Sequence, residues 1–204
     1  MTDVVVIDSG GANLASLLYA LARLGARAEV SADPARIGAA THVLLPGVGS
    51  AHDAMRRLEA AQLPEVIRGL RQPLLGICLG MQLLFDASDE APAGLGPTRG
   101  IGLLPGRVTR MLPAPDLPVP HMGWNQLQVL RADPLLAGIG AADYVYFVHS
   151  YMAPPSDATL ATTDYGRPVP AVVRRGNFRG VQFHPERSAK VGARLLANFL
   201  ELEE

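Results

Sequence analysis

The sequence predicts an α/β protein, a single domain over residues 1–204 with a mostly parallel sheet, helices on both faces and an antiparallel extension. Two observations carry this expectation. In the first half, short apolar runs that end in glycine alternate with stretches whose leucines recur at helical spacing. In the second half, strand-like runs follow one another and are separated by turns rich in proline and glycine.

The first half is typical of strand–turn–helix units in series. Strands are expected at 4–8, 28–30, 42–45 and 74–77. Leucines at helical spacing predict a first helix from Leu14 that Gly25 ends. A second helix is expected through Met55, Leu58 and Leu63, and a third is expected to start at 81–85.

The second half is expected to add the antiparallel strands. These strands are expected at 102–111, 126–130, 144–151, 159–163, 171–175 and 178–183. The chain then closes with an amphipathic helix over 188–202. Its apolar face consists of Val191, Leu195, Leu196 and Phe199.

Composition excludes several classes of protein. Hydrophobic residues make up 49% and charged residues 18%, which is enough apolar material for a core and too little charge for a disordered chain. The formal net charge of -1 disfavours a nucleic-acid-binding protein, because such proteins usually carry a basic excess. No run reaches the roughly 18 apolar residues of a membrane helix, and the N-terminus does not resemble a signal peptide. We therefore expect no membrane and no nucleic-acid partner.

Cys78 is the only cysteine, so an intrachain disulfide and a zinc site built from cysteines are excluded. A lone thiol is typical of proteins in a reducing compartment, so we expect a cytoplasmic protein. His42, His52 and His121 are isolated, and no spacing of His, Asp and Glu indicates a metal site. No metal and no cofactor are therefore expected.

The strongest local signal is the segment 76–82, GICLGMQ, which is expected where a buried strand ends and a helix begins. Cys78 lies at this boundary with a glycine two residues to either side. Small neighbours relieve the crowding of Cβ atoms in such a turn, as in a nucleophile elbow. Unpaired N–H groups and the dipole at the start of a helix favour a thiolate over a thiol. The pattern favours a nucleophile over the alternative, a buried structural cysteine.

A second signal is the segment 180–186, GVQFHPE. In an extended chain, residues i and i+2 point to the same side, so Glu186 can accept a hydrogen bond from His184 and leave the other ring nitrogen free as a base. Alone, this pair is more typical of a surface loop. Together with Cys78 it makes a nucleophile, a base and an orienting acid, provided that the two segments end on adjacent strands.

Glycines also follow the strand expected at 42–45, in the segment PGVG at 46–49. Such glycines let backbone N–H groups point at a developing oxyanion, an effect worth on the order of 100- to 1000-fold in rate for each donor. Taken alone, a tight turn is the better reading of this segment. The turn SGGAN at 9–13 resembles a phosphate cradle, but it lacks the dinucleotide fingerprint and the P-loop lysine.

Five segments together resemble the class I, or triad, glutamine amidotransferases, and among these the glutaminase subunits of imidazole glycerol phosphate synthase. The segments are LPGVG at 45–49, GICLGMQLLF at 76–85, PHMGWN at 120–125, YFVHSY at 146–151 and GVQFHPE at 180–186. They follow in the same order, almost from end to end. The cysteine elbow and the His-x-Glu motif belong to the whole superfamily, whereas the segment at 120–125 points to these subunits. The resemblance implies a flavodoxin-like amidotransferase fold.

The resemblance also implies roles for individual residues. Cys78 would attack the side-chain amide of glutamine, His184 would transfer protons, and Glu186 would orient His184. The oxyanion hole would consist of the backbone N–H groups of Val48 and Leu79. The residues that would hold glutamine are Gly47, Gly49, Gln82, Glu90, Ser150 and Tyr151.

The same resemblance implies a partner, the (β/α)8 cyclase subunit of imidazole glycerol phosphate synthase, which would receive the ammonia in a heterodimer of histidine biosynthesis. Asn13, Trp124 and Arg187 would lie toward that partner. Two positions depart from the family pattern. The turn at 9–12 lacks the common Tyr-Gly-x-Gly form, although Asn13 is kept, and Arg187 stands where lysine is frequent.

Three other functions are compatible with parts of the pattern. A glutaminase that serves a different acceptor is disfavoured by the segments 46–49 and 120–125. A non-catalytic binding module is disfavoured because Cys78, His184 and Glu186 are all present. A free-standing thiol hydrolase is disfavoured by the resemblance to subunits that depend on a partner.

Overall fold

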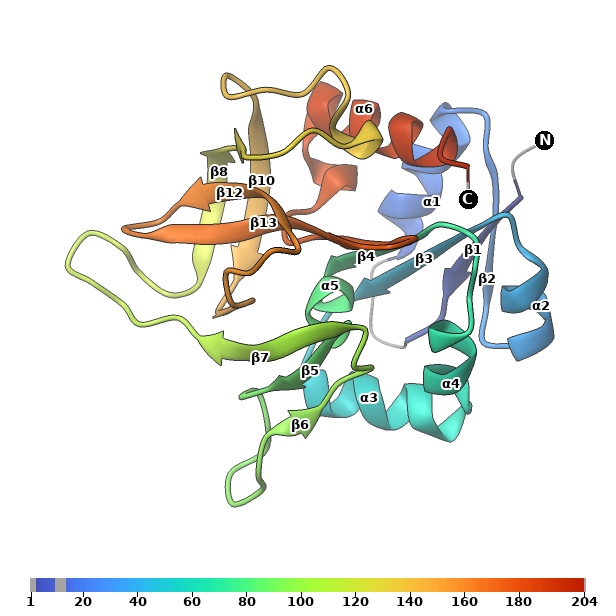
Figure 1. Cartoon of the computed structure of the whole chain (residues 1–204), viewed down its shortest axis with the longest axis horizontal. Coiled ribbons are helices and arrows are strands. Elements are labelled where there is room, and N and C mark those ends of the chain that lie inside the picture. Colours follow the sequence, from blue (N-terminus) through green and yellow to red (C-terminus); the bar gives the residue numbers. More distant parts are fainter. Residues whose placement is uncertain (1–2, 10–13, 204) are drawn as a thin grey trace.

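The computed structural model describes residues 3–9 and 14–203, and an eight-stranded sheet crosses its middle (Figure 1). The strand order is β2-β1-β3-β4-β14-β13-β12-β9. In chain order these strands are β1 Asp3–Ile7, β2 Arg27–Ser31, β3 His42–Gly47, β4 Leu74–Cys78, β9 Gln128–Val129, β12 Thr159–Asp164, β13 Pro168–Arg175 and β14 Phe178–Val181. The strands from β2 to β14 in this order pair in parallel, and β13, β12 and β9 continue the sheet in antiparallel fashion. The predicted parallel sheet with an antiparallel extension is therefore confirmed.

Helices cover both faces of the parallel part of the sheet (Figure 1). The helices are α1 Leu14–Arg23, α2 Pro34–Ala39, α3 Ala51–Ala60, α4 Leu63–Arg68, α5 Leu79–Leu83 and α6 Ala189–Leu200. One face packs on α1 and α6, and the other packs on α2, α3, α4 and α5. Among the described residues, none of the helices is long and apolar enough to cross a membrane.

Strand β1 shows why the sheet is buried on both sides. Val4 and Val6 pack against α1 and α6, whereas Val5 and Ile7 pack against the opposite layer. Successive side chains of a strand point to opposite faces, so an uninterrupted apolar run is what a doubly covered strand requires. Burial of each such side chain contributes about 1.5–3 kcal/mol, which ties both helical layers to the same strand.

Two smaller sheets stand beside the main one, and the sequence did not predict them as separate sheets. One pairs β8 His121–Gln126 with β10 Tyr144–His149, and the other has the order β11-β7-β5-β6. The strands of the second are β5 Phe85–Ser88, β6 Thr98–Arg99, β7 Leu104–Arg110 and β11 Tyr151–Met152. The strand expected at 126–130 is divided because the chain changes sheets at the buried Leu127, and the strand expected at 144–151 is divided between β10 and β11.

The helix expected to start at 81–85 is placed wrongly. Helix α5 begins at Leu79 and ends at Leu83, and Phe85 already belongs to β5. The carbonyl groups of Leu83, Leu84 and Phe85 accept hydrogen bonds from N–H groups of residues 101–104. Because a neighbouring segment supplies these donors, the carbonyls do not need a continuing helix.

The second expected helix is in fact two, because Gln62 adopts a left-handed conformation (φ 56°) between α3 and α4. Helix α2 was not predicted at all. Its start carries recognisable signals, since Asp33 caps the N–H of Ala35 and Pro34 stands at the first helical position. The final helix and its apolar face of Leu195, Leu196 and Phe199 are confirmed.

Candidate active site

The carboxyl ends of three adjacent parallel strands bring the candidate residues together. Strand β4 lies between β3 and β14, with Gly47 of β3 opposite Cys78 and Val181 of β14 opposite Ile77. Cys78 ends β4, and His184 follows β14 by three residues. Ligand sites of open α/β sheets form at this edge, because loops leave the strands there in diverging directions.

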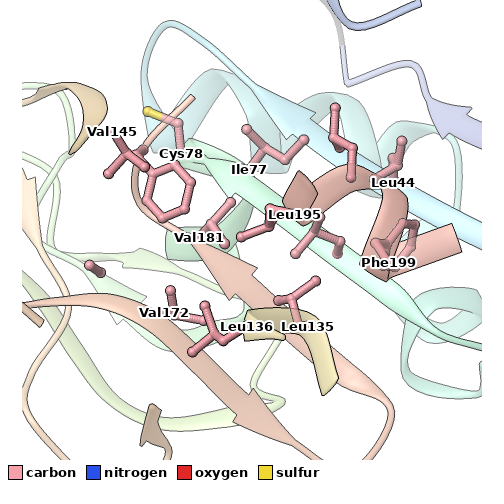
Figure 2. Packing of buried hydrophobic residues seen from close by; sticks show 14 of the residues in the cluster. Leu44, Ile77, Cys78, Leu135, Leu136, Val145, Val172, Val181, Leu195 and Phe199 are labelled. Atoms are coloured by element: carbon pink, nitrogen blue, oxygen red, sulfur yellow. The ribbon is translucent and has the colours of Figure 1, made fainter. Parts of the chain in front are cut away.

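The backbone at Cys78 is strained, with φ 54° and ψ -110°. A positive φ is rare for a residue with a Cβ atom and costs on the order of 1–3 kcal/mol. The conformation turns the chain sharply from β4 into α5, as in a nucleophile elbow. The thiol is largely buried and lies at the end of a core cluster that includes Ile77, Val181 and Leu195 (Figure 2).

Glycines allow this turn to pack closely on the neighbouring strand. A Cβ atom on Gly80 would lie 1.7 Å from the carbonyl oxygen of Leu45, and one on Gly76 would lie 2.8 Å from the backbone of Gly80. Neither contact leaves room for a side chain. The steric reason expected for glycines on either side of Cys78 is therefore confirmed.

His184 is oriented by Glu186. Nδ1 of His184 lies 2.8 Å from Oε1 of Glu186, so Nδ1 donates and Nε2 is left for other partners. The two residues do not lie in extended chain, as the sequence suggested, because Pro185–Arg187 forms the 3-10 helix η2. The short turn, rather than strand alternation, brings the carboxylate back to the ring.

His184 lines the same cavity as Cys78, and the interaction between the two side chains changes the acidity of the imidazole. Burial alone would lower the pKa of His184. Hydrogen bonds and charge attraction from Cys78 and Glu186 outweigh that effect and raise the pKa to about 10. At neutral pH the imidazole is therefore protonated, and a positively charged ring beside a cysteine is a setting typical of reactive cysteines.

The main chain of His184 is held by β10. The N–H of His184 donates to the carbonyl of Tyr146 over 2.9 Å. The hydroxyl of Ser188 donates to the carbonyl of His184 over 2.7 Å and accepts from the N–H of Tyr146 over 3.0 Å. The backbone N–H and carbonyl groups of His184 are thus both held by hydrogen bonds within the protein, without a ligand.

A cavity of about 390 Å³ opens in front of Cys78 and His184. The expected site residues that line it are Gly47, Val48, Gly49, Cys78, Leu79, Gln82, Glu90, Ser150, Tyr151, His184 and Arg187. Glu186 does not line this cavity, but it lines a second cavity of about 360 Å³ together with His184 and Arg187. The N–H of Leu79 belongs to the first residue of α5, so it is one of the donors that a helix leaves without an intrahelical partner.

Glu90 is a half-buried carboxylate at this cavity. Its Oε2 accepts a hydrogen bond of 2.8 Å from the N–H of Ala51, at the start of α3. Desolvation raises the pKa of Glu90, and the bond from Ala51 opposes the shift. A cationic ligand group beside this carboxylate would act in the opposite direction, lowering its pKa and favouring its charged form.

The structure adds residues that sequence reasoning did not single out. Gln182 is fully buried, and its Nε2 lies 3.8 Å from Sγ of Cys78. His149 lines the cavity, and its Nε2 lies 3.0 Å from Nδ1 of His121. The expectation that His121 stands alone was therefore wrong. The position of Gln182 two residues before His184 was the available signal, because alternation places both near the same strand end.

Two of the three expected partner-facing residues meet on the surface. The guanidinium of Arg187 stacks over the ring of Tyr146 at 4.5 Å, and Trp124 packs edge-on against the same ring at 6.0 Å. Trp124 is 52% exposed although it is a large aromatic residue. Asn13 lies outside the described residues. No group of three or more His, Cys, Asp or Glu residues in the described part of the chain could hold a metal ion.

Comparisons with known proteins agree with this geometry. The family model described as "Glutamine amidotransferase class-I" matches residues 5–202. The chain belongs to the class I glutamine amidotransferase family. It is therefore a glutamine amidotransferase, and the enzyme class predicted from the motifs is confirmed.

Curated relatives show which members of the amidotransferase family this chain is similar to. A protein named "Imidazole glycerol phosphate synthase subunit HisH" from Xylella fastidiosa is 52% identical over 203 residues, which is 100% of this chain and 99% of that protein. The protein of the same name from Xanthomonas euvesicatoria is 54% identical over 202 residues, with 99% and 98% covered. The resemblance to these subunits that the segment at 120–125 predicted is confirmed.

Solved structures support the amidotransferase fold. A structure described as a putative GMP synthase subunit from Thermoplasma acidophilum superposes with a TM-score of 0.74 at 18% identity, covering 98% of this chain and 92% of that one. Another, described as a glutamine amidotransferase, has a TM-score of 0.73 at 22% identity, with 97% of each chain covered. Both likenesses concern the fold alone.

Proposed function

We propose that this amidotransferase is the glutaminase subunit of an imidazole glycerol phosphate synthase, and that residues 1–204 act as one glutaminase domain. The observation that carries the proposal is that Cys78 and His184 line one cavity of about 390 Å³ and that Glu186 accepts a hydrogen bond from Nδ1 of His184. The identity of 52% to a subunit of that name in Xylella fastidiosa supports the choice of synthase. The single cysteine is in keeping with work in a reducing cytoplasm.

In the first half of the proposed reaction, Cys78 acts as the nucleophile. Its thiolate attacks the side-chain amide carbon of glutamine and forms a C–S bond, while the carbonyl electrons move onto oxygen. The protonated imidazole of His184 then gives its proton to the amide nitrogen. The C–N bond breaks, ammonia leaves, and a glutamyl thioester remains on Cys78. The raised pKa of His184, about 10, supports this role because the proton is present before glutamine arrives.

In the second half, His184 starts neutral and acts as a base. It takes a proton from a water molecule, whose oxygen attacks the thioester carbon. The C–S bond breaks, glutamate leaves, and the thiolate and the protonated imidazole are restored. Glu186 holds Nδ1 throughout, so the same ring nitrogen, Nε2, serves both steps.

The remaining residues of the cavity are assigned to binding. The N–H groups of Val48 and Leu79 stabilise the oxyanion of both tetrahedral intermediates. The α-ammonium group of glutamine meets Glu90, whose raised pKa indicates a carboxylate short of positive partners. The rest of glutamine is held by Gly47, Gly49, Gln82, Ser150 and Tyr151.

The proposed partner is a (β/α)8 cyclase subunit that receives the ammonia. It combines ammonia with a phosphoribosyl-formimino aminoimidazole-carboxamide ribotide and makes imidazole glycerol phosphate and the ribotide that feeds purine synthesis. The exposed pair of Trp124 and Arg187 around Tyr146 supports a docking surface beside the cavity. Aromatic residues and arginine are enriched at protein interfaces. Asn13 is assigned to the same surface from the resemblance.

A glutaminase assay tests the proposal. Glutamate release is measured for the glutaminase chain by itself, with the cyclase, and with the cyclase together with its ribotide ligand. We expect release to rise strongly in the last two mixtures. Release that stays the same in all three would contradict the regulated-subunit part of the proposal, and no release in any mixture would contradict the glutaminase itself.

A further inference from the structure

Gln182 is a buried amide that the proposed reaction does not use. It lies between the end of β14 and His184, and none of it is exposed. Its backbone N–H donates to the carbonyl of Ala171 over 2.9 Å, which ties the residue to β13. Its side-chain Nε2 lies 3.8 Å from Sγ of Cys78, within the longer reach of hydrogen bonds to sulfur.

The hydrogen bonds around Gln182 determine which end of its amide faces the sulfur. Nε2 of Gln82 donates to the backbone carbonyl of Tyr151 over 2.9 Å, and a carbonyl can only accept. The same Nε2 lies 2.8 Å from Gln182, so the atom of Gln182 at that contact must be the acceptor Oε1. The donor Nε2 of Gln182 is therefore turned toward Cys78, because a flipped amide would set two N–H donors against each other at Gln82.

The carbonyl of Tyr151 also accepts a second hydrogen bond, from a histidine. Nδ1 of His149 donates to it over 2.8 Å, so Nε2 of His149 is an acceptor when the ring is neutral. His121 then donates from Nδ1 to His149 over 3.0 Å and accepts at Nε2 from the amide of Asn125. Burial lowers the pKa of both histidines to about 4, so both rings are neutral at physiological pH and this order of donors is fixed.

Other groups near Cys78 also affect the equilibrium between its thiol and its thiolate. The carbonyl of Val148 lies 3.8 Å from Sγ and accepts the S–H proton, which favours the neutral thiol. The protonated imidazole of His184 favours the thiolate. The titratable groups that line this cavity beside Cys78 are His149 in β10, Tyr151 in β11, Glu90 after β5, His184 after β14 and Arg187 in η2, and Glu186 is hydrogen-bonded to His184. A fixed N–H donor adds to the effect of His184 and opposes that of Val148.

We propose that Gln182 is a side-chain hydrogen-bond donor to the Cys78 thiolate, turned toward the sulfur by Gln82 and the carbonyl of Tyr151. The proposal rests on the proposed function in taking Cys78 as the nucleophile. Hydrogen bonds to a charged acceptor stabilise the charged form. Gln182 therefore keeps more of the sulfur in its reactive form, in addition to the imidazolium.

The test measures the rate at which iodoacetamide alkylates Cys78 as a function of pH, in the full chain without glutamine or partner. Cys78 is the only cysteine, so the mass of the intact chain reports the reaction. In Gln182→Met, which keeps similar bulk without a donor, we expect the rate at pH 7 to fall about tenfold and the titration midpoint to move upward. In Gln182→Glu, whose carboxylate still accepts from Gln82 but faces the sulfur with negative charge, we expect a larger fall, on the order of 100-fold.

Gln72→Met is the matched control. Gln72 is another buried glutamine, and its Nε2 donates to the carbonyl of Ile37 before the opposite end of β4. This variant should keep the wild-type alkylation profile, which separates the loss of a buried hydrogen bond from an effect on the thiol. A wild-type profile in Gln182→Met would overturn the proposal. If Gln182→Met does not fold, a wild-type profile in Gln182→Glu would overturn it equally. The alkylation needs no glutaminase activity, so a failure of the proposed function leaves this result readable.

Discussion

His184 and Glu186 are joined by a hydrogen bond of 2.8 Å between Nδ1 and Oε1, although only Pro185 separates them in the chain. The 3-10 turn that follows β14 folds the carboxylate back onto the ring. Cys78 lines the same cavity as His184, and both Cys78 and Glu186 act to raise the pKa of the imidazole. Substitutions at the three positions can therefore separate the roles of the three groups.

Glu186→Gln tests the part played by the carboxylate charge. The amide oxygen still accepts from Nδ1, but the negative charge that helps to raise the pKa of His184 is lost. We expect kcat/KM for glutamine to fall by about 100-fold, less than in a variant without the nucleophile. The imidazolium loses its proton as pH rises through its pKa, so the alkaline limb of the pH profile should move to lower pH. An unmoved alkaline limb, measured in the complex with the cyclase, would contradict this role.

Gly80→Ala tests the close packing that supports the strained turn at Cys78. The added methyl would lie 1.7 Å from the backbone oxygen of Leu45, which belongs to β3 and cannot move aside alone. We expect the free energy of unfolding in urea to fall by about 3 kcal/mol, with loss of glutaminase activity. The control is Gly38→Ala in α2, where a Cβ atom would meet no atom within 4 Å. Equal stability of the two variants would show that the contact is not as rigid as described.

The buried pair of His121 and His149 predicts a loss of stability in mild acid. Burial lowers the pKa of each to about 4, below the ordinary value of 6.5. Between pH 6.5 and 4 the unfolded chain therefore binds protons that the folded chain does not. The contribution of this pair to stability is complete above pH 6.5 and falls as pH decreases through this range.

His121→Phe tests this assignment, because a phenyl ring can keep the stacking on Phe147 and Tyr165. The variant removes one of the two groups that resist protonation. Between pH 4 and 6.5, the slope of unfolding free energy against pH should be smaller than in the wild type by up to about 1.4 kcal/mol per pH unit. Chemical denaturation at a series of pH values gives both slopes, and identical slopes would rule out the buried neutral pair.

The sequence predicted the parallel core and the candidate triad because both depend on local patterns. An apolar run such as Val4–Ile7 can be buried on both faces only in a sheet that is covered on both sides. The glycines around Cys78 are required because a side chain there would clash, which can be inferred from the sequence and is seen in the structure. The short helix α5 could not be predicted in the same way. Its end depends on donors from residues 101–104, which no local pattern connects to it.

The buried polar contacts near the cavity could not be predicted from the sequence for the same reason. His121 and His149 lie in separate strands, and their contact depends on the antiparallel register of β8 with β10. Likewise, the contact of Gln182 with Cys78 depends on the parallel pairing of β14 with β4. Residue type and spacing identify candidates, but pairings between distant strands decide which of them meet.

Cys78→Ala is the most direct test of the account, because everything proposed for the site depends on this sulfur. The measurement compares synthesis driven by glutamine with synthesis driven by added ammonia, in the same complex with the cyclase. We predict that the variant loses glutamine-driven synthesis by at least about 10,000-fold and keeps ammonia-driven synthesis at the wild-type rate. Glutamine-driven synthesis that survives the substitution would contradict Cys78 as the nucleophile.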